Sequence, residues 1–325
     1  MTDTHVSGSP RTLLLSGASG FVGGRLLQRL AAGELPALDG VRVHAITRTQ
    51  PKHWPLEGVD WSPCDLSDPD SVQRLVLELG VAPTWVLHLG GLADPRVAAR
   101  HPRQARSVNA GGTRNLLSAL SNIARPQTPV RFLLSSTAAV YGQEALDAEG
   151  RIPAGTRPRT RTAYGWSKRL AERSALACSA PGLDVMVARP YNHAGPGQSD
   201  GYVVPDLCAA LREARETGQP MHTGNLWPER DLLHVDDVLD AYLLLLQRGE
   251  SGGIYDIARG ETFAIQEILD GLIERLGPPP GLELDPERAR PGESPRIVGD
   301  ARAIRALGWE PRLGLAEILD GAVSG

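Results

Sequence analysis

Cysteine is scarce in this sequence, and the few that occur lie far apart. The chain of 325 residues holds three, Cys64, Cys178 and Cys208. None has a short spacing to another cysteine or to a histidine, so neither a disulfide framework nor a structural zinc site is expected. We therefore predict a cytoplasmic protein with no metal in its functional site.

The sequence also lacks an excess of basic residues and long apolar runs. Its formal net charge is −4, which gives no basic face of the kind that nucleic-acid binding requires. The longest apolar run, Ala241–Leu246, falls far short of the roughly 20 residues that span a bilayer. The N-terminus has neither the basic nor the apolar region of a secretory signal. These features predict a soluble protein with neither a nucleic-acid nor a membrane partner.

What the sequence does contain is an alternation of two patterns. Short β-rich apolar runs alternate with amphipathic stretches long enough to form helices. The runs are Thr12–Ser16, Val41–Ile46, Trp85–Leu89, Val130–Leu134 and Val185–Ala188, and the stretches are Phe21–Ala32, Pro69–Leu79, Ala105–Ile123 and Ala163–Ala180. Continuous apolar strands joined by helices indicate a parallel sheet covered on both faces. Right-handed crossovers then give an α/β fold, a doubly wound parallel sheet of the Rossmann type.

The alternation fades after about residue 190. Stretches rich in Pro and Gly then separate expected helices at Val203–Glu216, Asp236–Arg248, Ala264–Leu276 and Ala301–Leu307. We predict that residues 1–190 form a dinucleotide-binding domain and that residues 191–325 form a smaller, mostly helical substrate domain. Residues 231–260 are expected to return to the first domain, with Tyr255–Ala258 as a late strand.

A glycine-rich segment follows the first expected strand and opens the first expected helix. It reads Gly17-Ala18-Ser19-Gly20-Phe21-Val22-Gly23. Glycine permits a tight turn and lets backbone amides approach a pyrophosphate at the positive end of a helix. The segment therefore predicts a dinucleotide site, although its G-x-x-G-x-x-G spacing differs from the commoner G-x-G-x-x-G.

The end of the second expected strand bears on which dinucleotide binds. An NAD site usually places a carboxylate there, which accepts a hydrogen bond from the ribose 2′-hydroxyl. This chain has Thr47 and Arg48 instead. A guanidinium suits a 2′-phosphate by charge and by its paired donors. The sequence therefore favours NADP(H), with NAD(H) as the alternative. For Arg48 itself, the alternative is a solvated surface arginine that contacts no cofactor.

A Tyr-x-x-x-Lys motif provides candidate catalytic groups. Tyr164 and Lys168 are four residues apart on an expected helix, so their side chains share one face. A phenol with a pKa of about 10 is a poor acid–base group at neutral pH, and a nearby ammonium is expected to lower that pKa. Thr137, which ends Ser135-Ser136-Thr137 after the fourth expected strand, adds a hydroxyl at the carboxyl edge of the sheet.

Taken together, these segments resemble the extended short-chain dehydrogenases/reductases that act on nucleotide sugars. The matching segments run in family order along nearly the whole chain: SGASGFVGGRLL, DLSDPDSV, LHLGGLADP, VNAGGTRNLL, LLSSTAAVYG, YGWSK, ARPYNHAGPGQ, RDLLHVDDVLDAY and LGWEPRLGL. Within that family, RPYNHAGPGQ is most similar to GDP-4-keto-6-deoxy-D-mannose reductases and the related GDP-mannose 4,6-dehydratases. The resemblance implies a nucleotide-sugar substrate, with GDP favoured.

The resemblance also implies roles for individual residues. Thr137 would bind the reacting oxygen, Tyr164 would act as the acid–base group, and Lys168 would tune Tyr164 and contact the nicotinamide ribose. Asp65 and Leu66 match the pair beside adenine. In this chain, the segment His88, Leu89, Gly90 and Gly91 matches the family's loop that lines the cofactor. For His88, a strand-end histidine without a chemical role is the alternative interpretation.

On the substrate side, the resemblance implies contacts with the diphosphate and the nucleotide. Asn192, Arg230 and Arg290 match positions that hold these groups, and the guanidinium fork suits phosphate oxygens. Val203 lies in a segment, with Val204 and Pro205, that matches the flank of the base. Each of these residues has a purely structural role as its alternative.

The two residues after Thr137 bear on the reaction. Dehydratases of this family have an acidic residue there, whereas this chain has Ala138 and Ala139. A methyl group cannot exchange a proton, which disfavours elimination and favours reduction of a C4 ketone to GDP-D-rhamnose or its C4 epimer. A 4-epimerase with tightly bound NAD is the nearest alternative, a 4,6-dehydratase is less favoured, and a non-catalytic NADP-sensing protein is the alternative from another class.

The resemblance implies a homodimer as well. Members of the family commonly pair through two helices, which here correspond to Ala105–Ile123 and Ala163–Ala180.

Overall fold

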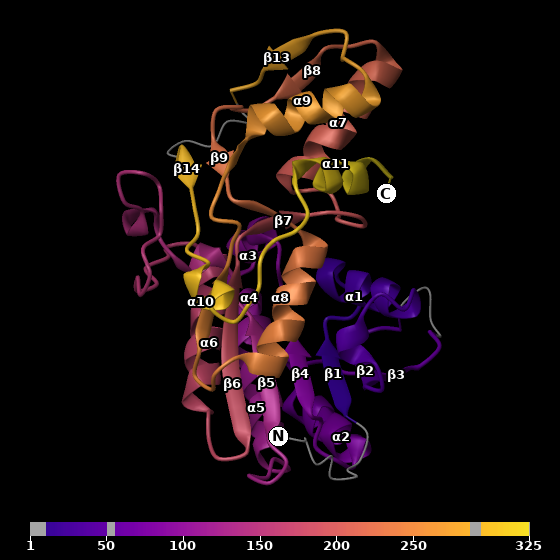
Figure 1. Ribbon diagram of the computed structural model, residues 1–325, viewed down its shortest axis with the longest axis vertical. Coiled ribbons are helices and arrows are strands. Elements are labelled where there is room, and N and C mark those ends of the chain that lie inside the picture. The colour runs from indigo at the N-terminus through magenta and orange to yellow at the C-terminus, as the bar shows by residue number, and fades with distance from the viewer. Residues whose placement is uncertain (1–10, 51–55, 287–293, 325) are drawn as a thin grey trace.

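The computed structural model describes residues 11–50, 56–286 and 294–324, and its main element is a parallel sheet (Figure 1). Seven strands lie in the order β11-β6-β5-β4-β1-β2-β3. Their bounds are β1 Thr12–Ser16, β2 Arg42–Thr47, β3 Val59–Pro63, β4 Trp85–His88, β5 Val130–Ser135, β6 Leu183–Pro190 and β11 Ile254–Ile257. The order runs outward in both directions from β1 and β4, so their carboxyl ends form the switch point where such sheets bind ligands. The predicted doubly wound fold is confirmed.

Helices cover both faces of this sheet, as can be followed in Figure 1. Leu13 and Leu15 of β1 belong to one buried apolar cluster, which includes residues of α1 (Phe21–Ala31) and α8 (Val235–Arg248). Leu14 belongs to a second cluster, with residues of α2 (Pro69–Leu79), α5 (Gly112–Ser121) and α6 (Ala163–Ala177). Successive strand side chains point to opposite faces, so burial of both faces explains the continuous apolar runs.

Two elements of the sheet differ in how well the sequence pattern predicts them. The return strand expected at Tyr255–Ala258 is observed as β11, parallel to β6. The apolar-run pattern misses β3, which is an edge strand that pairs with β2 alone. Only the first of its five residues is buried, so it has no need of a continuous apolar run.

The helix expected over Ala105–Ile123 is interrupted. The structure has α4 (Pro102–Arg106), then a π-helical segment at Ser107–Gly111, and then α5. Such π segments often lie at functional sites, and this one contains Asn109, whose contacts are described below.

The later part of the chain forms a smaller lobe, at the top of Figure 1. Its helices α7 (Val203–Thr217), α9 (Ile265–Leu276) and α11 (Leu315–Ser324) share a third apolar cluster. Its short strands pair as β7 Asn192–Ala194 with β10 Leu232–His234, β8 Met221–Thr223 with β13 Leu282–Leu284, and β9 Glu229–Arg230 with β12 Phe263–Ala264 and β14 Arg296–Ile297.

Short helices complete the fold. They are α3 Pro95–Arg100 and α10 Arg302–Arg305, with single 3-10 turns at Pro36–Leu38, Ala138–Val140 and Gln143–Ala145. Among the described residues, no helix is both long enough and apolar enough to cross a membrane.

Candidate active site

A cavity of about 820 Å³ lies at the carboxyl ends of the strands and reaches into the smaller lobe. Most of the residues singled out in the sequence line it, although they come from segments far apart in the chain. These are Gly17, Ser19, Gly20, Phe21, Val22, Gly23, Arg48, Asp65, Leu66, Leu89, Gly90, Gly91, Thr137, Tyr164, Lys168, Asn192 and Val203.

The glycine-rich loop forms one end of this cavity, and its packing requires glycine. Gly17 has a φ of +75°, and a Cβ there would lie 2.7 Å from the amide nitrogen of Gly90. A Cβ on Gly23 would lie 2.3 Å from the carbonyl oxygen of Gly17. Gly20 caps α1 without any side-chain hydrogen bond, so the first amides of the helix remain available to an anion. This cradle fits the pyrophosphate of a dinucleotide.

The cavity wall after β2 and β3 carries charges that bear on cofactor choice. Arg48 is exposed and lines the cavity, directly after β2. Hydrogen bonds from Ser67 hold the pKa of Asp65 below its usual value, and the positive charge of Arg48 lowers it further. Arg48, at the end of β2 where a ribose 2′-substituent is expected, therefore lies close enough to Asp65 to influence its pKa.

Beneath the cofactor loop, four buried residues form a neutral hydrogen-bonded chain. The Oγ of Thr113 donates to the carbonyl oxygen of Asn109 (2.6 Å), so it can accept from Nε2 of His88 (3.1 Å). Nδ1 of His88 then accepts from the Oγ of Ser16 (2.7 Å). We call Ser16, His88, Thr113 and Asn109 the neutral chain.

Both ends of the neutral chain hold parts of the active site. The Oγ of Ser16 accepts from the amide of Gly90 (3.0 Å). The side-chain amide of Asn109 accepts from Leu92 N (2.7 Å) and donates to the Oγ of Ser167 (2.8 Å), which lies on α6 between Tyr164 and Lys168. His88 itself is 1% exposed and is not among the residues that line the cavity. Its position therefore favours a structural role.

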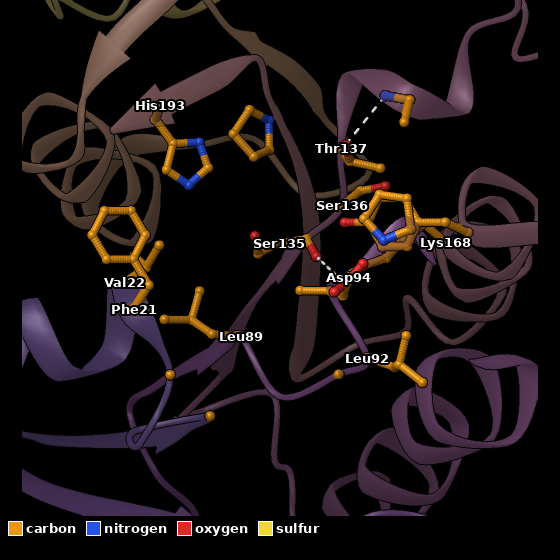
Figure 2. Close-up of a pocket in the computed structure, with 18 of the residues that line it drawn as sticks. Phe21, Val22, Leu89, Leu92, Asp94, Ser135, Ser136, Thr137, Lys168 and His193 are labelled. Carbon is orange, nitrogen blue, oxygen red and sulfur yellow. Dashed lines mark hydrogen bonds between the residues drawn. The ribbon is translucent and has the colours of Figure 1, made fainter. Parts of the chain in front are cut away.

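Thr137, Tyr164 and Lys168 meet at the opposite wall from the glycine-rich loop. Figure 2 shows Thr137 and Lys168 on one side of the cavity and Phe21 on the other. The Oγ of Thr137 accepts a hydrogen bond from the amide of Ala139 (3.2 Å), and its side chain also hydrogen-bonds Tyr164. The ammonium of Lys168 donates to the carbonyl oxygen of Ser135 (2.8 Å).

The pKa shifts at these residues differ from the sequence-based expectation. Burial raises the pKa of Tyr164 well above its usual value, and the hydrogen bond with Thr137 opposes this only in part. Burial lowers the pKa of Lys168 to about 8, against the opposing charge of Glu172. Burial dominates the Tyr164 pKa, because a phenolate in this wall would lose its hydration. The expectation of a lowered Tyr164 pKa is wrong, and the phenol carries its proton at neutral pH.

Behind Thr137 lies a second buried polar network, which carries charge. Arg189 donates from Nε and Nη2 to the two carboxylate oxygens of Glu172 (2.9 and 2.8 Å), and from Nη1 to the hydroxyl of Tyr141 (2.7 Å). Ser136 donates to Glu172 (2.5 Å), and Tyr141 donates to Asp256 (3.0 Å). We call these five residues the Arg189 cluster.

The Arg189 cluster secures the loop that carries Thr137 from both sides. Ser136 precedes Thr137 and Tyr141 follows it, and each is hydrogen-bonded into the cluster. Glu172 lies one helical turn after Lys168 on α6. Burial raises the pKa of Asp256 to about 7, and Arg189 only partly opposes this.

On the substrate side, the structure places the expected residues unequally. Asn192 on β7 and Val203 at the start of α7 line the cavity. Arg230 lies on β9, where its Nη1 donates to the carbonyl oxygens of Glu229 (2.8 Å) and Ser294 (3.1 Å), and it is not among the lining residues. Arg290 lies outside the described residues.

Sequence reasoning misses a stacked pair of cavity-lining rings, one from α1 and the other from β7. The rings of Phe21 and His193 stack with centroids 5.9 Å apart and planes 6° apart (Figure 2). Nδ1 of His193 hydrogen-bonds the carbonyl oxygen of Tyr191 (2.9 Å). His193 stands within RPYNHAGPGQ, so the motif itself carries the signal. Asp94 and Tyr202 also line the cavity, and no local pattern singles them out.

Comparisons with known proteins identify the family of this chain. Residues 13–258 match the NAD dependent epimerase/dehydratase family. The chain is 34% identical to a GDP-6-deoxy-D-mannose reductase of Pseudomonas aeruginosa, over 96% of each protein. It is 29% identical to a UDP-glucose 4-epimerase of Azospirillum brasilense, over 99% of this chain and 92% of that protein. The chain therefore belongs to the NAD dependent epimerase/dehydratase family.

A solved structure supports the same conclusion at the level of the fold. The structure of RMD from Pseudomonas aeruginosa complexed with NADPH matches with a TM-score of 0.81 and 31% identity, and the match covers 97% of this chain and 98% of that one. The predicted extended short-chain dehydrogenase/reductase type is confirmed, and the chain is an NAD(P)-dependent enzyme of that type. In the described part of the chain, no group of three or more His, Cys, Asp or Glu residues is placed to hold a metal ion.

Proposed function

We propose that this chain uses NADPH to reduce the C4 ketone of a nucleotide-linked 4-keto-6-deoxyhexose, converting GDP-4-keto-6-deoxy-D-mannose into GDP-D-rhamnose or its C4 epimer. The observation that carries the proposal is the wall beside the reacting group. Thr137 and Tyr164 line the cavity, and the two residues that follow Thr137 there, Ala138 and Ala139, are methyl-bearing. Elimination needs further acid–base groups at such positions, whereas reduction needs one proton donor. The similarity to a GDP-6-deoxy-D-mannose reductase supports the same reaction.

Each catalytic residue has a role that its environment suits. NADPH, when bound, supplies the hydride that adds to C4. Tyr164 gives its phenolic proton to the C4 oxygen, so one hydride and one proton turn the ketone into an alcohol. Its raised pKa keeps that proton in place at neutral pH. Thr137 donates a hydrogen bond to the same oxygen, and Lys168 contacts the nicotinamide ribose.

We assign the cofactor as NADP(H), with NAD(H) as the alternative. The glycine cradle would hold the pyrophosphate, Arg48 the 2′-phosphate, and Asp65 and Leu66 the adenine. Leu89, Gly90 and Gly91 would line the nicotinamide half. The NADPH complex of the Pseudomonas aeruginosa RMD supports this assignment. In Arg48→Ala, NADPH affinity measured by fluorescence is expected to fall at least tenfold while NADH affinity changes little. Unchanged affinity for both would assign Arg48 to the solvated surface, and an equal loss for both would contradict a contact with the 2′-phosphate.

The nucleotide sugar would occupy the rest of the cavity. Asn192 and Val203 are placed to contact the diphosphate and the base, and we retain Arg230 and Arg290 as candidates for the phosphates. The GDP-linked name of the curated relative supports guanine as the base. Competition among GDP, UDP, CDP and dTDP for the ketosugar site tests that choice.

The reductase proposal is tested by following NADPH oxidation with GDP-4-keto-6-deoxy-D-mannose generated in situ. We expect turnover by the wild type and a loss of roughly 10²- to 10⁴-fold in Tyr164→Phe, because the proton donor is removed. Tyr255→Phe, outside the cavity, is the matched control. No turnover with this or the corresponding dTDP, UDP and CDP ketosugars would reject the proposal, and release of NAD on denaturation would favour the 4-epimerase.

We further propose a cytoplasmic homodimer whose protomers pair through α5 and α6. Trp166 on α6 is 45% exposed, and the guanidinium of Arg169 lies 5.3 Å from its ring centroid. An exposed aromatic beside an arginine is typical of an interface core. Trp166→Glu is expected to halve the mass measured by light scattering.

We also retain the division of the chain into a cofactor domain, residues 1–190 with the return of 231–260, and a substrate domain, residues 191–325.

A further inference from the structure

The cavity wall next to Thr137 is apolar, although its side chains come from three separate segments. Each of these side chains lines the cavity and packs on the same buried cluster. They are Ala138, Tyr141, Leu146, Ile152 and Ile297, which we call the apolar recess. Backbone hydrogen bonds hold the segments together: Ile152 N donates to Val298 O (3.0 Å), and Val298 N donates to Gly150 O (2.9 Å).

The one hydroxyl among these five side chains is already engaged. Tyr141 Oη donates to the carboxylate of Asp256 (3.0 Å) and accepts from Arg189 (2.7 Å). The guanidinium of Arg189 also lies 4.9 Å from the centroid of the Tyr141 ring. The Arg189 cluster thus holds the hydroxyl in the protein interior, and Tyr141 contributes its ring to the recess.

Other groups that line the cavity near the reacting centre are polar. They are Lys168, Asp94 and Ser135, and Figure 2 shows them in the same part of the cavity as Thr137. Charged and hydroxyl groups suit the sugar hydroxyls and the phosphates, whereas an apolar wall suits a methyl group. In a hexose, C6 is only two covalent bonds from C4. Once C4 is fixed by Thr137 and Tyr164, C6 therefore lies against a wall immediately beside them.

We propose that the apolar recess receives C6 and makes the enzyme selective for a 6-deoxyhexose over the same hexose with a 6-hydroxyl. This inference rests on the proposed reductase function and names the residues that set its substrate class. A hydroxyl placed in the recess would lose its water partners without gaining a protein partner. Two polar side chains that also line the cavity could change this outcome: the exposed Gln143, and Tyr191, whose buried hydroxyl makes no hydrogen bond to a described residue.

The test runs the reaction in reverse with NADP+. The nucleotide-linked product of the forward reaction is compared with the same nucleotide hexose carrying a 6-hydroxyl, so that the two substrates differ by one oxygen atom. We expect kcat/KM to favour the 6-deoxy compound by roughly 10- to 100-fold. Calorimetric affinities of the same pair for the NADP+-loaded enzyme should follow the same order.

Two variants locate the selectivity. Leu146→Ser offers a hydroxyl partner inside the recess and should reduce the preference at least fivefold, with Ile297→Thr as a second variant should the first fail to fold. Leu77→Ser, at a 67% exposed position on α2, is the matched control and should leave the preference unchanged. Equal kcat/KM values in the wild type, or an unchanged preference in both recess variants, would overturn the inference.

The outcomes also separate this inference from the proposed function. If the ketosugar is reduced but the enzyme does not discriminate at C6, the proposed role of the recess is refuted and the proposed reductase function is retained. No reduction of any ketosugar, in protein that still binds NADPH by fluorescence, refutes the reductase, and the recess falls with it.

Discussion

Two buried networks support the active site, and they differ in charge. The neutral chain, from Ser16 to Asn109, lies under the cofactor loop and is built from hydroxyls, an amide and an imidazole. Burial lowers the pKa of His88 to about 3, so the ring is uncharged at neutral pH. Every link can be satisfied by a donor and an acceptor without any counter-charge, which is the least costly way to bury polar groups.

The Arg189 cluster lies behind Thr137 and has two carboxylates for one guanidinium. The two carboxylate oxygens of Glu172 accept from both arms of the guanidinium fork, and the side chains of Glu172 and Arg189 are only 4% and 6% exposed. Asp256 is left with Tyr141 as its hydrogen-bonding partner and with a raised pKa of about 7. The neutral chain therefore does not titrate near neutrality, whereas the Arg189 cluster holds a carboxyl group that does.

Of the changes considered for the two networks, removal of Arg189 should lower the free energy of unfolding the most. Arg189→Met leaves two buried carboxylates without their cation, and breaking such a pair costs about 3–5 kcal/mol. We expect a loss of that size in the free energy of unfolding, measured in urea at neutral pH. Arg189→Lys keeps the positive charge but not the paired donors of the guanidinium, so its loss in the free energy of unfolding should lie between that of Arg189→Met and zero. A loss below about 1 kcal/mol in Arg189→Met would mean that the cluster contributes little.

Asp256→Asn should remove the pH dependence of the charged network. A raised carboxyl pKa means that the folded protein binds this proton more tightly than the unfolded chain does. The stability that it contributes is full below about pH 4 and is lost as pH rises through about 7. The variant should therefore exceed the wild type at pH 8, by up to about 4 kcal/mol, and the gap should narrow toward pH 4. A gap that is constant across this range in urea titrations contradicts the assignment.

Breaking the neutral chain should cost less and should show no titration above neutral pH. His88→Asn removes at least one buried hydrogen bond, for a loss of about 1–3 kcal/mol. The wild-type contribution is full above the unfolded pKa of about 6.5 and is lost as pH falls toward 3. Equal losses at pH 7.5 and pH 8.5 are therefore expected. NADPH affinity should also weaken, because Ser16 holds Gly90. His44→Asn, at a half-buried position on β2, is the control.

The smallest coupling energy is expected for an exposed ion pair, which serves as the reference for the buried pair of Arg189 and Glu172. Arg42 and Asp60 are 2.8 Å apart, with side chains 67% and 54% exposed. A double-mutant cycle with alanine should give a coupling energy below about 0.5 kcal/mol that vanishes in salt. The same cycle at Arg189 and Glu172 should exceed about 2 kcal/mol. Similar couplings at both sites would show that burial does not distinguish them.

Local signals explain which parts of the site the sequence predicts. The glycine-rich loop, Tyr164 with Lys168, and Thr137 each depend on residues close in the chain at the end of one strand or on one helix. Their meeting at one sheet edge then follows from parallel strand order. The fold is predictable for the same reason, because strands buried on both faces read as apolar runs, and β3 is missed because it lies at an exposed edge.

Contacts set by register between distant segments escape such reasoning. Asp256 meets the Arg189 cluster only because β11 pairs with β6 in the register that places it opposite Arg189. The stack of Phe21 on His193 likewise joins the two lobes. The apolar recess joins loops that are far apart in the chain. The raised pKa of Tyr164 is also out of reach, because it depends on how much protein surrounds the phenol rather than on its spacing from Lys168.

The late position of β11 and α8 in the chain has a consequence for biosynthesis. A ribosome releases the chain from the N-terminus, and domains generally fold as units. The sheet gains its outer strand only after residue 257, and the face under α8 stays uncovered until residue 248 has emerged. Until then β6, almost entirely buried in the finished protein, is an unpaired edge open to strands of other chains. Nascent chains stalled before this point are expected to aggregate and to require chaperones.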